Sequence, residues 1–208
     1  MLAGLGELSF VEMIEIPLSD VNETCKLKTR EVIKDDRQWF VMRDLTRSNA
    51  RHPAYLMLKE LKLRYFTPMV TKLMVRNGRR EAVEVPFMQD LIFVYDTREI
   101  IDPIVERVNT FQYRYLRNTN REPMTVRKEE MERFIRVVES SKFPRYYRPD
   151  EITPEMYNRR IRIVGGQLNG YEGNLVTTRG SKTKRLLVEL PLLLAAAVEV
   201  EPEYIQLL

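Results

Sequence analysis

The side chains that most often carry catalysis are few in this sequence, and they do not cluster. The only histidine is His52 and the only cysteine is Cys25. A nucleophile needs an adjacent base and a structural zinc site needs four Cys or His ligands, so neither kind of site is expected. The adjacent carboxylates at residues 35–36 and 129–130 point apart on a strand and lie about 100° apart on a helix, so we interpret both pairs as solvated charge. We therefore expect no enzyme, no metal site and no cofactor.

Five of the eight glycines lie between residues 165 and 180, which raises the question of a phosphate-binding loop. Their spacing fits neither G-x-x-x-x-G-K-S/T nor G-x-G-x-x-G, the patterns in which backbone N–H groups hold phosphates. The surrounding sequence alternates as strands do: in RIRIV, Ile161 and Ile163 point to the same side. Five such short strands fall within residues 159–208, where glycine permits the sharp corners of a small barrel. A small β-barrel therefore explains the glycines better than a phosphate loop does.

The bulk composition is that of a soluble protein, with 44% hydrophobic and 31% charged residues. The most apolar run, residues 190–198, is far shorter than the roughly 18 residues of a membrane-spanning helix. The first residues lack the basic lead of a signal peptide and one cysteine allows no internal disulfide, so we expect a cytoplasmic protein. A net charge of +4 is compatible with a nucleic-acid or acidic protein partner, and equally with a mildly basic surface.

Four parts follow one another along the chain. Residues 1–36 are weakly periodic and are interpreted as an extension that is partly helical or disordered. Residues 37–141 alternate between strand and helix signals. Residues 142–158 contain three prolines, a density that favours an extended linker. The small barrel is expected over residues 159–208.

The second part, residues 37–141, predicts an α+β sandwich, in which strands pair around helices. Its clearest helix has Met131, Phe134 and Val138 on one stripe. Asn77-Gly78 between two β-rich runs is a strong hairpin signal, because both residues tolerate a positive φ. Strands are predicted at 38–44, 64–75, 81–87, 90–96 and 111–117, and helices at 52–62, 97–108 and 127–141.

Two sets of side chains in this part are candidates for nucleic-acid contact. The hairpin tip carries Arg76, Arg79 and Arg80, which either contact phosphates and bases or form an ordinary solvated turn. Tyr113 and Tyr115 alternate with arginines, so both tyrosines lie on one face of a strand. That face either stacks on bases or is buried against a helix.

The stretch IRIVGGQLNGYEGNL resembles the KOW motif, with Gly166 and Gly173 at its two characteristic glycines and Tyr171 at its aromatic position. Upstream, WFVM, RYFTP and EPMTVRKEEMERFI resemble, in order and spacing, the N-terminal (NGN) domain of the NusG family of bacterial transcription factors. Ribosomal proteins also carry KOW motifs, but the NGN-then-KOW order across a Pro-rich linker is more specific. The resemblance implies an NGN-type α/β sandwich over residues 37–141, a linker over 142–158 and a five-stranded KOW β-barrel over 159–208.

One departure from the family pattern points to a specialised paralogue. Residues 87–92 read FMQDLI, where housekeeping NusG has a Phe-Phe-Pro-Gly-Tyr-Val run. The extension before Trp39 is also unusual for the family. Both features are similar to the UpxY-type antiterminators of capsular polysaccharide operons.

The resemblance also implies partners for the NGN part. The family docks a concave apolar face on the clamp helices of RNA polymerase, and burial in the core is the alternative for several of the matching residues. By position, the polymerase contacts would be Trp39, Phe66, Pro68, Phe87, Met88 and Leu91. The basic hairpin tip lies near upstream DNA in the family, which implies contact with non-template DNA or nascent RNA.

For the KOW part, the resemblance implies a protein partner, either a small-subunit ribosomal protein or the termination factor Rho. Leucines replace the family's aromatic contact residue. The contact surface is therefore expected to remain apolar, but these residues do not indicate which of the two proteins is bound. By position, the partner-binding residues would be Gly166, Leu168, Tyr171, Gly173, Leu192, Leu193 and Leu194.

The resemblance therefore implies a monomeric, non-enzymatic factor that holds the polymerase clamp closed and promotes processive elongation and antitermination. Such a factor would be found in the cytoplasm, on the nucleoid, through RNA polymerase. A ribosome-associated KOW-domain RNA-binding protein is the alternative. That class needs a density of basic residues that +4 over 208 residues hardly supplies.

Overall fold

The computed structural model describes residues 36–47, 50–76, 78–117, 119–157, 159–177 and 182–208. The chain divides into two units, Met1–Asp35 and Asp36–Leu208, and the structure described below is that of the second. Cys25, Asp35, Asn77 and Gly180 lie outside the described residues.

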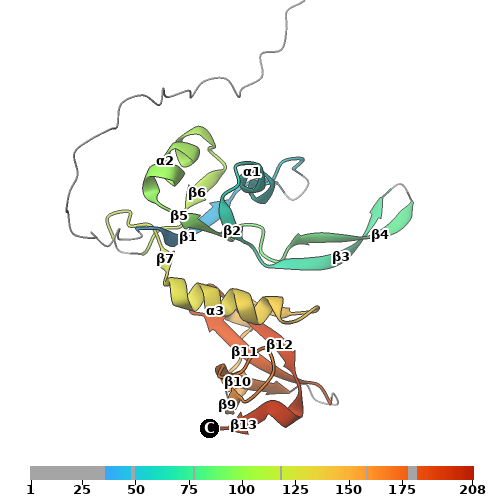
Figure 1. Cartoon of the computed structure of the whole chain (residues 1–208). Coiled ribbons are helices and arrows are strands. Elements are labelled where there is room, and N and C mark those ends of the chain that lie inside the picture. The colour runs from blue at the N-terminus through green and yellow to red at the C-terminus, as the bar shows by residue number, and fades with distance from the viewer. Residues whose placement is uncertain (1–35, 48–49, 77, 118, 158, 178–181) are drawn as a thin grey trace, which may run out of the picture. The chain divides into compact units, whose positions relative to one another are not determined.

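An antiparallel sheet forms the centre of the N-terminal part (Figure 1). Its strand order is β2-β5-β1-β6, and the short strand β7 also pairs with β1. The strands are β1 (Gln38–Asp44), β2 (Arg64–Phe66), β5 (Ile92–Asp96), β6 (Phe111–Tyr113) and β7 (Thr125–Val126). The expectation of strands between residues 38 and 113 is confirmed, although the last of them ends at Tyr113 rather than at residue 117.

Helices cover both faces of this sheet, and the two-residue period of the strands decides which side chain meets which helix. Phe40 and Met42 of β1 pack with α1 (Ala54–Glu60) and α2 (Arg98–Arg107). Trp39 and Val41 point the other way, into the cluster that contains the buried side of α3 (Lys128–Glu139). The predicted stripe of α3 is buried, including Met131, Phe134 and Val138. This arrangement confirms an α+β fold.

A long hairpin, the arm, extends from the N-terminal part. It consists of β3 (Met69–Arg76) and β4 (Arg79–Pro86), which pair only with each other. The register places Val75 opposite Arg80 and Arg76 opposite Arg79, and Gly78 in the turn has a φ of +75°. Figure 1 shows the arm standing away from the helices and the central sheet. The predicted hairpin is therefore present.

The C-terminal part is a six-stranded antiparallel sheet of order β13-β9-β10-β11-β12-β8. The strands are β8 (Arg145–Tyr147), β9 (Arg160–Ile163), β10 (Glu172–Thr177), β11 (Lys184–Leu190), β12 (Leu194–Val200) and β13 (Ile205–Leu207). Three short 3₁₀ turns lie at Pro149–Glu151, Pro154–Tyr157 and Pro202–Tyr204.

This sheet differs from the expected five-stranded barrel in two respects. Five of its strands come from residues 159–208 as predicted. Among the described strands, however, the two edge strands β8 and β13 do not pair with each other, so the sheet does not close into a barrel. The sixth strand, β8, comes from the segment expected to be a linker. Pro144 and Pro149 bracket Arg145–Tyr147 and leave its backbone N–H groups free to pair with Ala195–Ala197 of β12.

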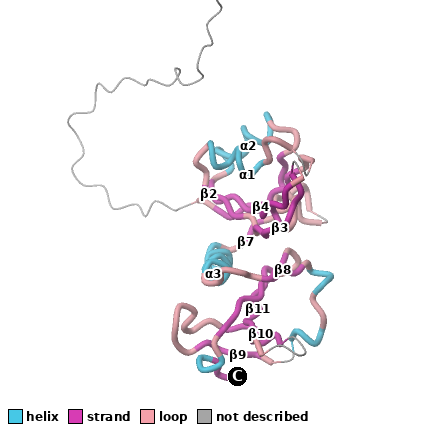
Figure 2. The backbone as a smooth tube through the Cα atoms, turned by 90° about the vertical axis from the view of Figure 1, so that its right-hand side faces the viewer, coloured by secondary structure: helices cyan, strands magenta, loops and turns pink. Residues whose placement is uncertain are grey.

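Helix α3 contacts the C-terminal strands β11 and β12, and Figure 2 shows it beside them. Buried residues of both parts therefore belong to a single hydrophobic cluster. On the helix, Arg133 donates a hydrogen bond to the carbonyl of Glu172, and its guanidinium lies 5.3 Å from the ring centroid of Tyr171. Nearer the arm, the rings of Phe87 and Tyr146 lie 5.6 Å apart, and burial raises the pKa of Tyr146 to about 12.

The glycines of the C-terminal part serve two different needs. Gly165 and Gly166 have φ values of +113° and +65°, which residues with side chains rarely adopt, and the ring of Tyr204 packs against both. Gly173 lies within β10, where a Cβ atom would fall on the carbonyl oxygen of Leu187 in β11. One motif glycine thus shapes a turn, and the other permits two strands to approach.

Replacing Gly173 should therefore damage the C-terminal sheet more than replacing a turn glycine. We expect Gly173→Ala to lower the free energy of unfolding by about 3 kcal/mol, the cost of overpacking an interior without space. Gly78→Ala, at the open tip of the arm, should cost only about 1 kcal/mol from its left-handed backbone. Urea unfolding followed by circular dichroism compares the two variants, and equal losses would contradict the close-approach role of Gly173.

Candidate docking surfaces

The apolar residues predicted to bind polymerase lie on one side of the central sheet but differ in accessibility. Trp39 and Leu91 are fully buried, with 0% of their surface exposed. Phe66, Phe87 and Met88 are half-buried and pack against the same cluster, on the α3 side. Pro68, which follows β2, is buried. The structure therefore brings the set together, with three members partly accessible and the others beneath them.

A groove runs between the edge strand β2 and helix α3. Its volume is about 320 Å³. Trp39, Phe66 and Ile135 give it apolar walls, while two arginines and two glutamates supply its charged groups. It is lined by Trp39, Arg64, Tyr65, Phe66, Glu132, Ile135, Arg136 and Glu139. A groove that combines apolar and charged side chains is suited to binding another protein's side chains.

Arg64 covers the indole of Trp39 in this groove. Its guanidinium lies 5.1 Å from the Trp39 ring centroid and 5.2 Å from that of Tyr95. Its Nη1 also lies 3.3 Å from the Oε1 of Glu132 on α3, so one side chain links the strand to the helix. The Trp39 Nε1 is buried without a hydrogen-bond partner in the described part of the chain.

Sequence reasoning did not select Arg64. The signal was present, because an arginine begins the RYFTP segment and a single tryptophan lies on a central strand. What the sequence lacked was the pairing of β2 with β5, which brings Arg64 next to Tyr95.

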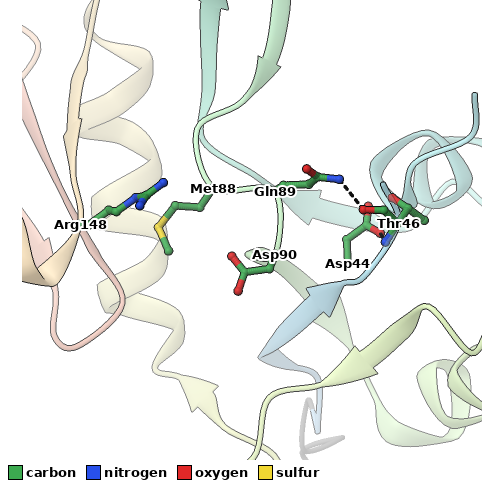
Figure 3. A pocket seen from close by; sticks show the side chains of 6 residues that line it. All are labelled: Asp44, Thr46, Met88, Gln89, Asp90 and Arg148. Atoms are coloured by element: carbon green, nitrogen blue, oxygen red, sulfur yellow. Dashed lines mark hydrogen bonds between the residues drawn. The ribbon is translucent and has the colours of Figure 1, made fainter. Parts of the chain in front are cut away.

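Met88 lines a second pocket, of about 530 Å³. Figure 3 shows Met88 on the same side of this pocket as Arg148, with Asp44 and Thr46 across from them. The pocket is lined by Asp44, Thr46, Met88, Gln89, Asp90 and Arg148.

Three of the polar side chains that line this pocket hold neighbouring segments together. The carboxylate of Asp44 accepts hydrogen bonds from the backbone N–H groups of Thr46, at 2.9 Å, and Ala54, at 2.8 Å. Gln89 donates to the carbonyl of Thr46, and Asp90 lies 3.5 Å from Arg114. The departure from the family pattern at residues 87–92 thus places two polar side chains where they hold neighbouring segments.

The candidate catalytic and metal-binding side chains lie at separate places in the part of the chain that the structure describes. No group of three or more potential metal ligands occurs there. The Nε2 of His52 lies 3.4 Å from Glu60, and both side chains are exposed. Glu130 pairs with Arg127 at 3.1 Å on the surface of α3. None of the helices described is both long and apolar enough to cross a bilayer.

The two tyrosines considered for base stacking have different environments. Tyr113 is buried and donates a hydrogen bond of 2.7 Å to Asp102 of α2. Burial and this hydrogen bond raise the pKa of the Tyr113 hydroxyl well above its usual range. Its burial against a helix is therefore confirmed, whereas Tyr115 is exposed.

The basic tip of the arm is open to solvent. Arg79 and Arg80 are exposed, and Arg76 ends β3 opposite Arg79. Leu73 and Val75, just before the tip, expose 75% and 70% of their surface.

The residues predicted to bind a partner through the KOW part are mostly interior. Leu168, Leu193 and Leu194 are buried in the core, and Tyr171 is half-buried beneath Arg133. Gly166 is exposed, and so is Leu192 between β11 and β12, with 85% of its surface accessible. Its φ of +63° is unusual for a residue with a side chain.

One protein family matches the segment that contains the central sheet and the arm. Residues 37–135 match the NusG family model, described as transcription termination factor nusG. The match begins just before β1 and ends within α3, so it spans the central sheet, the arm and the groove. No curated protein matches the chain. This segment of the chain is therefore NusG-like.

The cover that Arg64 provides for Trp39 can be measured, because Trp39 is the only tryptophan. Removing the guanidinium in Arg64→Ala should expose the indole and increase quenching of its fluorescence by acrylamide. Loss of the cation–π contact should lower the free energy of unfolding by about 1 kcal/mol.

Arg98→Ala is the matched control, since it removes a guanidinium 6.0 Å from the ring of Tyr113 instead. It should leave the quenching of Trp39 unchanged. Equal quenching in wild type and Arg64→Ala would show that Arg64 does not shield the groove.

Proposed function

We propose that this protein is a non-enzymatic, NusG-like elongation factor that binds elongating RNA polymerase. The observation that carries the proposal is the NusG family match over residues 37–135, which coincides with the α+β part and its groove. The match supports a role in transcription elongation or termination. We propose antitermination of long operons, such as capsular polysaccharide loci, because residues 87–92 depart from the housekeeping pattern in the way that UpxY-type factors do.

Docking would use the α3 side of the central sheet. Partly accessible Phe66 and Met88 would contact the clamp helices of polymerase, together with Ile135 at the groove. Trp39 and Leu91 would support these contacts from below, since both are fully buried. Binding only the closed clamp shifts its equilibrium toward that state, so no bond chemistry is required.

The C-terminal part would recruit a second protein, a small-subunit ribosomal protein or Rho. Leu192 supports this proposal best, because a left-handed backbone costs about 1 kcal/mol and here it displays an apolar side chain. Such strain persists at sites with a role in recognition. The arm tip, Arg79 and Arg80 with Arg76, would contact the nucleic acid of the transcription complex.

Polymerase docking is tested by Met88→Asp. A carboxylate in the apolar contact should weaken capture of RNA polymerase by on the order of 2 kcal/mol, roughly 30-fold. Ile100→Asp is the matched control, because Ile100 is an exposed apolar residue of α2, on the opposite face of the sheet. Leu91→Asp is unsuitable, since a charge at a fully buried position would disrupt the core.

The measurement is a pulldown on polymerase with each variant, together with a thermal melt that confirms folding. Retention of polymerase by a folded Met88→Asp protein would show that docking occurs elsewhere. Retention of ribosomal RNA in place of polymerase by the wild type would favour the ribosome-associated alternative.

The proposed role of Leu192 predicts that one substitution raises stability and weakens partner binding. Leu192→Gly should stabilise the protein by up to about 1 kcal/mol, because glycine adopts a positive φ without strain. The same change should weaken binding to the ribosomal protein or Rho by removing the displayed side chain. Thermal melts and titration with each purified partner test both effects, and a variant that binds as tightly as the wild type would rule out Leu192 as the contact.

A further inference from the structure

The arm is a two-stranded ribbon that pairs with no other strand of the described chain. Such a ribbon is only marginally stable in water unless it packs against another structure. Its strands pair only with each other, over eight residues each, so both outer edges lack a neighbouring strand. Leu73 and Val75 expose most of their surface on its outer half. Exposed strand edges and exposed aliphatic side chains together indicate a surface that binds another molecule.

The charges at the tip of the arm point to a polyanion. Arg79 and Arg80 are consecutive at the start of β4, and both are exposed. Among the described residues, neither Arg79 nor Arg80 makes an ion pair. The acidic residues of the arm, Glu81 and Glu84, lie on β4 between the tip and the base. Within the described part of the arm, these two arginines therefore carry positive charge that no ion pair neutralises.

The register also divides the arm into two faces. Directly opposite residues share a face, so Leu73 with Ala82 and Val75 with Arg80 form one of them. Arg79 belongs to the other face, with Met74 and Glu81. One face of the outer arm is thus aliphatic and ends in a single arginine, while the other carries the mixed charges.

We propose that the arm lies in the major groove of double-stranded DNA. That groove is about 12 Å wide and about 8.5 Å deep and admits a two-stranded β-ribbon. The three steps from Leu73 to Arg76 extend about 10 Å at about 3.4 Å per residue, which is more than the depth of the groove. The aliphatic face meets thymine methyl groups, Arg80 reaches base edges and Arg79 reaches phosphates.

This inference deepens the proposed nucleic-acid contact at the arm tip and rests on it, but it does not depend on polymerase docking. It favours duplex DNA over single strands, because the arm has no aromatic side chain on which bases could stack. It also favours DNA over an RNA duplex, whose major groove is too narrow for side chains to enter.

The test uses the full chain without polymerase and a fluorescent DNA duplex of about 20 base pairs, or two helical turns. Fluorescence anisotropy at several salt concentrations gives both the affinity and its salt dependence. Arg79→Ala/Arg80→Ala should weaken duplex binding about tenfold and reduce the slope of log affinity against log salt by about 1, because only Arg79 reaches phosphates. Arg51→Ala/Lys59→Ala removes the same charge from exposed positions at α1 and should change neither quantity.

A second variant tests the aliphatic face separately. Leu73→Ser/Val75→Ser keeps every cation, so it should lower duplex affinity and leave the salt slope unchanged. The proposal that the arm binds the major groove is overturned if this variant binds the duplex with unaltered affinity. It is also overturned if the wild type binds the single strand, or an RNA duplex of the same sequence, more tightly than the DNA duplex. Because polymerase is absent from the assay, none of these results bears on docking through Met88.

Discussion

The burial of strand β1 on both faces is the constraint on which the N-terminal part depends. Trp39 and Val41 face α3, while Phe40 and Met42 face α1 and α2. Burying one such side chain contributes about 1.5–3 kcal/mol, which is comparable to the conformational entropy lost when one residue is ordered. Because the two faces are filled in strict alternation, a shift of one residue in register would exchange them. The groove beside β2 and the base of the arm are positioned by the sheet that this strand organises.

The groove and the pocket beside Met88 both use polar side chains to hold neighbouring segments together. In the pocket, the carboxylate of Asp44 holds the start of α1. In the groove, Arg64 stacks on Trp39 and pairs with Glu132, next to the apolar side chains of Phe66 and Ile135. Most of the residues that line the two hollows belong to the NusG-like segment, residues 37–135.

Local patterns predicted the elements well and their accessibility poorly. The Asn77-Gly78 signal located the arm, and the stripe at Met131 and Phe134 located α3, because both depend on neighbours in sequence. Strand β8 was missed, since Arg145–Tyr147 between prolines forms a strand only when β12 lies alongside. Leu168 and Leu193 were assigned to a partner contact although they are buried, because an apolar residue in a turn can face either the core or a partner.

The sequence by itself determined the α+β character, the hairpin with its basic tip and the NusG-like character of residues 37–135. These follow from periodicity, turn chemistry and motif spacing, which are properties of consecutive residues. Only the tertiary structure decided that Trp39 lies beneath Arg64, that Gly173 is needed for two strands to approach and that Leu192 alone of its leucine cluster is displayed. Each of these features depends on contacts between residues that are far apart in the sequence. Such contacts form only when the chain folds, so a local sequence pattern does not reveal them.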